Sequence, residues 1–67
     1  MQITLNNRVE NFESESLSIE DILLIKNFTF KLLVTKINGK LVKKVNRSEA
    51  LVKDGDNVLI LHLISGG

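Results

Sequence analysis

Apolar and polar residues alternate from the start of the chain. In MQITLN, residues 1–6, every second residue from Met1 to Leu5 is apolar, which is typical of a strand with one buried face. The Asn-Asn pair that ends this stretch and begins the next predicts a tight hairpin turn, because asparagine tolerates positive φ. In the returning segment VENFE, Val9 and Phe12 are expected to point inward. Their odd spacing indicates a bulge or imperfect pairing with the first strand.

The hydrophobic period changes in SLSIEDILLIKN, which predicts a helix from Ser18 to Lys26. Apolar residues recur here at intervals of three and four, the spacing of one helix face. Ser18 is a good N-cap residue, and Asp21 completes an S-x-x-D capping box. Negative charge in the first turn also suits the positive end of the helix dipole. The side chains expected to face the core are Ile19, Ile22 and Leu23.

The second half of the chain reads as three strands separated by turns. FKLLVTKIN and KLVKKV flank Asn38 and Gly39, a strong hairpin signal, and the lysines indicate a solvated edge strand. NRSEALV is expected to form a turn or a single helical turn, with Ala50 and Leu51 packed inward. KDGDN is a tight turn in which Gly55 can take positive φ, and VLILHLI is the last strand.

The order of these elements is β-β-α-β-β-β, with one helix early and a strand last. A single helix covers only one face of a sheet, so the fold class is α+β with a one-sided core. The layout predicts a β-grasp, or ubiquitin-like, domain with a mixed sheet in strand order 2-1-5-3-4, whose first and last strands are parallel neighbours. The core is expected to contain Ile3, Leu5, Ile19, Ile22, Leu23, Ile37, Leu51, Val58 and Ile60.

The last strand is apolar on both of its faces. Val58 and Ile60 are expected to face the helix, because the strand must fill the core before it passes the edge of the sheet. Alternation then places Leu59, Leu61 and Leu63 on the outer face, toward solvent. Isolated exposed leucines are common and need no function. Three along one strand face are better explained by a contiguous contact surface for a partner.

Composition excludes several functional classes. The 67 residues allow one domain, and the absence of cysteine excludes a disulfide framework and a thiolate nucleophile. His62 is interpreted as a residue of the surface or of the rim of the inner face, because one histidine cannot build a metal site or a catalytic triad alone. The net charge of +1, with both signs interspersed, argues against a nucleic-acid partner. No signal peptide or membrane-spanning segment is recognisable, so the expected location is the cytoplasm.

The stretch Ser-Gly-Gly follows directly on the aliphatic strand, which predicts a β-grasp domain over residues 1–64 and a flexible tail over residues 65–67. A C-terminal carboxylate is inert until activated, but joining it to AMP gives a mixed anhydride that a sulfur donor can convert to a thiocarboxylate. Ser65 is small and Gly66 lacks a Cβ, so such a tail can thread into a narrow active site of another protein. Simple fraying of the terminus is the alternative.

Several of these stretches together resemble the ThiS family of sulfur carrier proteins in thiamine biosynthesis. The resemblance covers essentially the whole chain: MQITLN, SIEDILL, INGKLV, DGDNVLILHLI and the terminal SGG. The specific part is the combination of DGD, an aliphatic strand and the final Gly66 and Gly67. Lys36 departs from the pattern, because relatives often carry a small apolar residue at this point of the third strand.

The resemblance implies a carrier rather than an enzyme, without catalytic residues, a metal or a stably bound cofactor. Gly67 would be adenylated by a ThiF-like enzyme that uses ATP and magnesium, and a cysteine desulfurase would ultimately supply the sulfur. The thiocarboxylate would then donate its sulfur to thiazole formation on thiazole synthase, ThiG. The outer face of the last strand, with Leu59, Leu61 and Leu63, would dock these partners.

Two other interpretations are compatible with the sequence. The small subunit of molybdopterin synthase, MoaD, shares the fold, the tail and the chemistry, but it typically has a Pro-Pro pair before the tail, and this chain has no proline. The more distant alternative is a non-covalent β-grasp interaction module whose Gly-Gly end is incidental. Incubation with ATP and a ThiF-type enzyme should modify the first two kinds of protein and leave the third unchanged.

Overall fold

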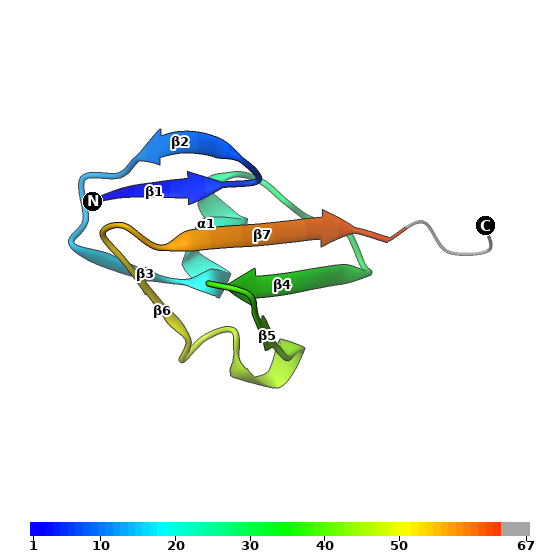
Figure 1. The fold of residues 1–67 in the computed structure, drawn as a ribbon. Coiled ribbons are helices and arrows are strands. Elements are labelled where there is room, and N and C mark those ends of the chain that lie inside the picture. Colours follow the sequence, from blue (N-terminus) through cyan, green and yellow to red (C-terminus); the bar gives the residue numbers. More distant parts are fainter. Residues whose placement is uncertain (64–67) are drawn as a thin grey trace.

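The computed structural model describes residues 1–63, which form a mixed five-stranded sheet with an α-helix across one face (Figure 1). A second sheet of two short strands accompanies it, and one of these strands leads directly into the helix. In the view of Figure 1 the five-stranded sheet lies in front and the helix behind it. The elements, in chain order, are β1 Gln2–Leu5, β2 Arg8–Asn11, β3 Ser16–Ser18, α1 Ile19–Ile25, β4 Leu33–Ile37, β5 Lys40–Val42, the 3-10 helix η1 Lys44–Asn46, β6 Leu51–Lys53 and β7 Asn57–His62.

The strands of the larger sheet lie in the order β2-β1-β7-β4-β5. Its centre contains the parallel pair of β1 and β7, and the other neighbours are antiparallel. The numbering differs from the expected 2-1-5-3-4 because the sequence pattern did not predict β3 and β6, which pair with each other in the smaller sheet. Counted along the chain without those two, the five strands have the expected neighbours. The α+β class with one helix on one face is confirmed.

Both predicted hairpins have two-residue turns with positive φ at both positions. Asn6 and Asn7 have φ of 51° and 67°, and Asn38 and Gly39 have φ of 49° and 81°. Positive φ at both central residues is the mark of the type I′ turn, whose twist suits antiparallel strands. These turn predictions are confirmed, and so is the positive φ of Gly55, which is 87°.

The pairing of β1 with β2 is regular, contrary to the bulge predicted from the spacing of Val9 and Phe12. Thr4 lies opposite Val9 and Ile3 lies opposite Glu10 without interruption. This register turns Val9 to the outer face of the sheet, where 62% of its surface is exposed. Phe12 is partly buried against the core. The inward position predicted for Val9 is therefore wrong, because the hairpin turn fixes the register and places Glu10 on the inner face instead.

The helix α1 begins at the predicted cap. Ser18 Oγ accepts a hydrogen bond from the Asp21 N–H at 3.0 Å, and Asp21 Oδ2 accepts one from the Ser18 N–H at 3.2 Å, so both halves of the capping box form. At the other end, the C-cap residue Lys26 forms an ion pair with Glu10 of β2, with 3.0 Å between Nζ and Oε2. No helix in the described part of the chain has the length and apolar character needed to cross a membrane.

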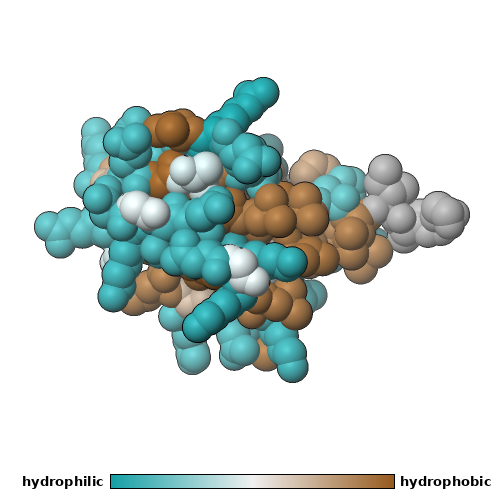
Figure 2. All heavy atoms as spheres, viewed as in Figure 1, coloured by the Kyte–Doolittle hydropathy of each residue, from teal (hydrophilic) through white to brown (hydrophobic). Residues whose placement is uncertain are grey.

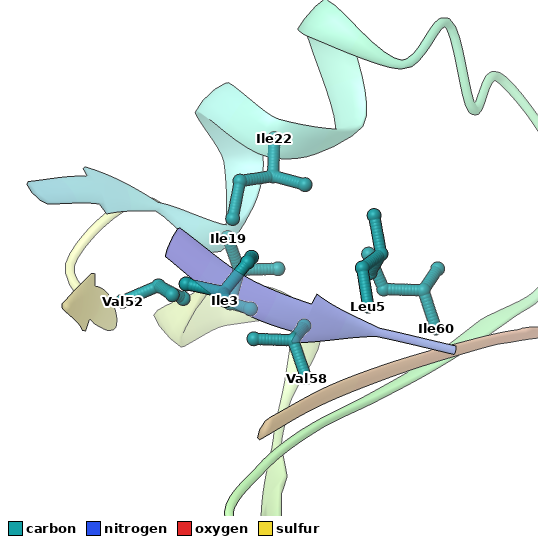
Figure 3. Close-up of a cluster of buried hydrophobic side chains, with 7 residues drawn as sticks. All are labelled: Ile3, Leu5, Ile19, Ile22, Val52, Val58 and Ile60. Atoms are coloured by element: carbon teal, nitrogen blue, oxygen red, sulfur yellow. The ribbon is translucent and has the colours of Figure 1, made fainter. Parts of the chain in front are cut away.

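The core lies between α1 and the sheet (Figure 3). Figure 3 shows Ile22 projecting from the helix toward the strand residues Ile3 and Leu5. Leu23 and Ile37, two of the predicted core residues, are partly buried and pack against this cluster. The fully enclosed members are Ile3, Leu5, Ile19, Ile22, Val52, Val58 and Ile60.

Leu51 does not belong to the core, contrary to the prediction. Its surface is 53% exposed, whereas its neighbour Val52 is completely buried. The reason is that residues 51–53 form β6 and pair with β3, so that successive side chains face opposite ways. The turn predicted before Leu51 is present at residues 47–49, where the N–H groups of Glu49 and Ala50 donate to the Asn46 carbonyl at 3.1 and 2.9 Å, and the 3-10 helix Lys44–Asn46 lies just before it.

The loop before β7 is tied to β1 by hydrogen bonds. Asp54 Oδ1 accepts one from the Gln2 N–H at 2.7 Å, and the Gly55 N–H donates to the Gln2 carbonyl at 2.8 Å. Asp56 Oδ2 accepts one from the Lys53 N–H at 2.9 Å and closes the turn. The DGD stretch therefore sets the point at which β7 begins beside β1.

Candidate functional site

The two faces of β7 have opposite surroundings. Val58 and Ile60 point toward the helix and are buried in the core. Leu59 points the other way and is half buried, while Leu61 and Leu63 are 44% and 48% exposed. The predicted division of this strand into an inner and an outer face is therefore confirmed.

Neighbouring strands widen the apolar surface around these leucines. Val34 of β4 lies opposite Leu61, so both side chains share the outer face. On β5, the exposed Leu41 lies on the same face, one strand further from β7. Figure 2, viewed from this side, shows a continuous brown area along the second half of β7. We call this surface the outer patch; it consists of Val34, Leu41, Leu59, Leu61 and Leu63.

Sequence reasoning did not identify Val34 and Leu41 as members of the outer patch. Alternation within β4 separates Val34 from its inward neighbours, but it does not say which residue of another strand lies opposite. That pairing depends on the register between strands that are distant in sequence. The signal that could have found Val34 is its alternation combined with the predicted strand order, which places β4 beside β7.

Lys36 divides the outer patch. It lies on β4, opposite Leu59 of β7 on one side and opposite Leu41 of β5 on the other. A half-buried lysine of this kind covers apolar neighbours with its aliphatic stem and keeps its ammonium group in water. Within residues 1–63 it forms no ion pair. The outer patch therefore presents a cation among aliphatic side chains, to which a carboxylate of a partner can bind.

His62 lies at the rim of the inner face, as predicted. Its ring stacks on Phe30, with 3.9 Å between the ring centroids and 19° between the planes. Together with Leu33 and Ile60, these rings line a small cavity of about 190 Å³. No group of three or more metal-ligating side chains occurs within residues 1–63. The contacts of His62 are those of a packing residue that joins the segment before β4 to the end of β7.

Asn6 holds β7 in place beyond the end of β1. Its backbone N–H donates to the Val58 carbonyl at 2.9 Å. Its side-chain Nδ2 donates to the Ile60 carbonyl at 3.1 Å, and its Oδ1 accepts from the Ile60 N–H at 2.8 Å. The side-chain amide of Asn6 thus makes the two hydrogen bonds to β7 that the backbone of a further β1 residue would otherwise make. Sequence reasoning identified Asn6 only as a turn residue, because no local signal reports a contact between such distant positions.

The predicted reactive tail lies outside the described residues. This applies to Ser65, Gly66 and Gly67, and to the predicted domain boundary after residue 64. Of the predicted site residues, the structure brings three together on the outer face. These are Leu59 and Leu61 of β7 and Leu63, which directly follows the strand. Leu63 continues the pairing of the strand, because its N–H donates to the Leu32 carbonyl at 2.9 Å.

Nearly the whole sequence matches the model of a known protein family. The family model described as ThiS matches residues 2–67. The chain belongs to the ThiS family. The match includes each helix and strand described above and extends through Gly67.

Solved structures of ThiS proteins have the same fold as this ThiS-family chain. A crystal structure of the thiamine biosynthesis protein ThiS from Geobacter metallireducens has a TM-score of 0.86 and 28% sequence identity, and the match covers both chains completely. A solution NMR structure of a thiamine biosynthesis protein from the same organism has a TM-score of 0.75 and 25% identity, covering all of this chain and 88% of that one. The search of curated proteins finds no match. The β-grasp class is confirmed by these structures.

Proposed function

We propose that this ThiS-family chain is a sulfur carrier of thiamine biosynthesis and not an enzyme. The observation that supports the proposal most directly is the family match over residues 2–67. The relative whose crystal structure matches along its whole length is a thiamine biosynthesis protein. A carrier presents its reacting group to the active sites of other proteins, so it needs no catalytic side chain of its own.

The proposed reacting group is the C-terminal carboxylate of Gly67. A carboxylate oxygen attacks the α-phosphorus of ATP, pyrophosphate leaves, and an acyl-adenylate forms. A sulfur nucleophile at the oxidation level of sulfide then attacks the carbonyl carbon and displaces AMP, which leaves a thiocarboxylate. In this proposal a ThiF-like enzyme binds the ATP and magnesium, and a cysteine desulfurase ultimately supplies the sulfur as an enzyme persulfide, from which a thiol reductant releases it at the level of sulfide. The thiocarboxylate finally gives its sulfur to thiazole formation on a ThiG-like thiazole synthase.

The small residues before Gly67 suit this chemistry. The carboxylate has to enter an active site that excludes water, and Ser65 and Gly66 bring little side-chain volume into such a channel. Glycine also accepts backbone conformations that other residues rarely adopt. Because the activation consumes ATP, we place the reaction in the cytoplasm.

The outer patch is the proposed docking surface for the ThiF-like enzyme and for the thiazole synthase. Leu61 and Leu63 each expose close to half of their surface, and they lie just before the tail in sequence. Covering aliphatic surface contributes about 25 cal/mol for each Å² removed from water. Both partners act on the same carboxyl end. Because they would also dock on the same surface, they could not bind the carrier at the same time. The carrier would then leave one enzyme before it meets the next.

Intact-mass spectrometry tests the proposal. The purified full chain is incubated with ATP, magnesium, a ThiF-like enzyme and sulfide, and its mass should rise by the difference between sulfur and oxygen. An unmodified chain would favour a non-covalent interaction module. Sulfur transfer into a thiazole synthase reaction, and not to a molybdopterin precursor, distinguishes the thiamine carrier from a MoaD-like subunit.

A further inference from the structure

A groove lies on the helix side of the molecule, on the opposite side of the sheet from the outer patch. It is bounded by α1, the segment of residues 26–32 and η1, and its volume is about 380 Å³. Leu23 and Leu24 of the helix and Phe28 and Phe30 of the following segment supply its apolar lining. Leu24 and Phe30 are among the large apolar residues that the fold leaves exposed. The groove therefore offers apolar surface that the described chain does not cover.

Arg47 lines the groove and is held by two hydrogen bonds. Its Nε donates to Thr35 Oγ1 at 3.2 Å, and its Nη2 donates to the Leu33 carbonyl at 2.6 Å. The side chain is half buried, and within residues 1–63 it forms no ion pair. The two bonds fix the plane of the guanidinium, which has further N–H groups for a ligand. A fixed and partly desolvated guanidinium favours an anionic group such as a carboxylate.

The charges around the groove are mainly positive. Lys31, Lys44 and Arg47 line it, against one acidic residue, Glu20. Cations beside apolar side chains are complementary to an occupant that carries carboxylates around an apolar side chain. A lipid surface fits this site less well, because a flat bilayer cannot follow a groove or reach the half-buried Arg47.

We propose that this groove binds an acidic peptide segment of a partner protein. An apolar side chain of the segment would lie between Leu24 and Phe30, and a carboxylate would bind Arg47 and Lys44. The groove is separate from the outer patch, so that a partner can occupy it while the C-terminal carboxylate is engaged elsewhere. This inference goes beyond the sulfur chemistry and does not depend on it.

Two short capped peptides probe the groove. Ac-EELFEE-amide carries the proposed chemistry, and Ac-KKLFKK-amide has the same apolar centre with the opposite charge. Each is titrated to millimolar concentration into the isotope-labelled full chain, and the backbone amide signals are followed by NMR. We expect the acidic peptide to bind at least about tenfold more tightly than the basic one. The signals that shift should be those of Leu24, Phe30 and Arg47.

Matched variants distinguish binding in the groove from general effects of charge and hydrophobicity on peptide binding. Lys44→Glu and Leu24→Ser change residues that line the groove, whereas Lys43→Glu and Ile25→Ser change exposed neighbours that do not. The first pair should weaken binding of the acidic peptide by about tenfold or more, and the second pair should bind as the unaltered chain does. Circular dichroism checks that all four variants fold, which their surface positions favour.

Results of three kinds would overturn the proposal. One is equal binding of the two peptides, or no shift with either. Another is an equal loss of binding in the groove variants and in their neighbours, or shifts centred on the outer patch. The third is binding to vesicles that contain phosphatidylglycerol, measured by cosedimentation, without binding of the acidic peptide, because that would assign the groove to a membrane surface.

Discussion

The side-chain amide of Asn6 hydrogen-bonds both the N–H and the carbonyl of Ile60. The contact joins a turn residue of the first hairpin to the last strand of the sheet. It completes the pairing of β7 at a point where β1, which ends at Leu5, can no longer supply it. The course of the chain toward Leu61 and the rest of the outer patch therefore depends on the first hairpin.

Replacing Asn6 with glycine should lower the free energy of unfolding by about 1–3 kcal/mol, because both backbone groups of Ile60 lose their partner. Glycine accepts the positive φ of this position, so the variant reports the hydrogen bonds and not backbone strain. Urea denaturation measures the free energy. Hydrogen exchange should also become faster at the amide of Ile60.

Asn7→Gly is the matched control for this prediction. Asn7 shares the positive φ of the turn but takes no part in the contact with Ile60. Its replacement should change stability by less than about 0.5 kcal/mol. Equal losses in the two variants would show that the turn conformation, and not the amide contact, accounts for the effect of Asn6.

Features that depend on nearby residues could be predicted from the sequence. The capping box needs only Ser18 and Asp21, and the second hairpin turn needs only Asn38 and Gly39. The inner and outer faces of β7 follow from alternation once one buried residue is assigned. These local signals, placed in chain order, were sufficient for the fold class and for the leucines of β7.

Features that depend on pairing between distant segments could not be predicted. The stretch from Ala50 to Val52 has no period of its own, so only its pairing with β3 decides that Val52 and not Leu51 faces the core. The same reason applies to Val34, which reaches the outer patch through the register of β4 with β7. The groove around Arg47 is formed by a helix, an irregular segment and a 3-10 turn, whose proximity no sequence pattern reports.

Val52→Ala should lower the free energy of unfolding by about 1–3 kcal/mol, because it removes buried methyl groups and leaves a cavity between the two sheets and the helix. Leu51→Ala, at an exposed neighbouring position, should change it by less than about 0.5 kcal/mol. Thermal or urea unfolding of both variants gives the comparison. If Leu51→Ala were the more damaging change, the register of β6 with β3 would be wrong.

Leu61→Ser should leave the fold intact and weaken binding to the ThiF-like enzyme by at least about tenfold, or ~1.4 kcal/mol. The fold should persist because Leu61 is already partly solvated, and binding should weaken because an apolar contact of the outer patch is lost. Isothermal titration calorimetry measures the binding, and circular dichroism checks the fold.

Val9→Ser is the control for the outer patch. Val9 also lies on the outer face of the sheet and is more exposed than Leu61, but it belongs to β2 and is separated from β7 by β1. Its replacement should leave binding unchanged. Undiminished binding of Leu61→Ser, or an equal loss in both variants, would mean that the outer patch is not the docking surface.

The position of the Gly67 carboxylate is the most direct test of the proposed carrier function. One alanine added after Gly67 moves the carboxylate by about 3.5 Å, the reach of an extended residue. A displacement of ~1 Å from productive geometry can already reduce a rate by about a hundredfold. The measurement is ATP–pyrophosphate exchange by a ThiF-like enzyme, with the unaltered and the extended chain compared side by side. We expect exchange with the extended chain to fall by at least about a hundredfold while its circular dichroism spectrum is unchanged. Exchange at the same rate with both chains would contradict the account, because the carboxylate of Gly67 would then not be the reacting group.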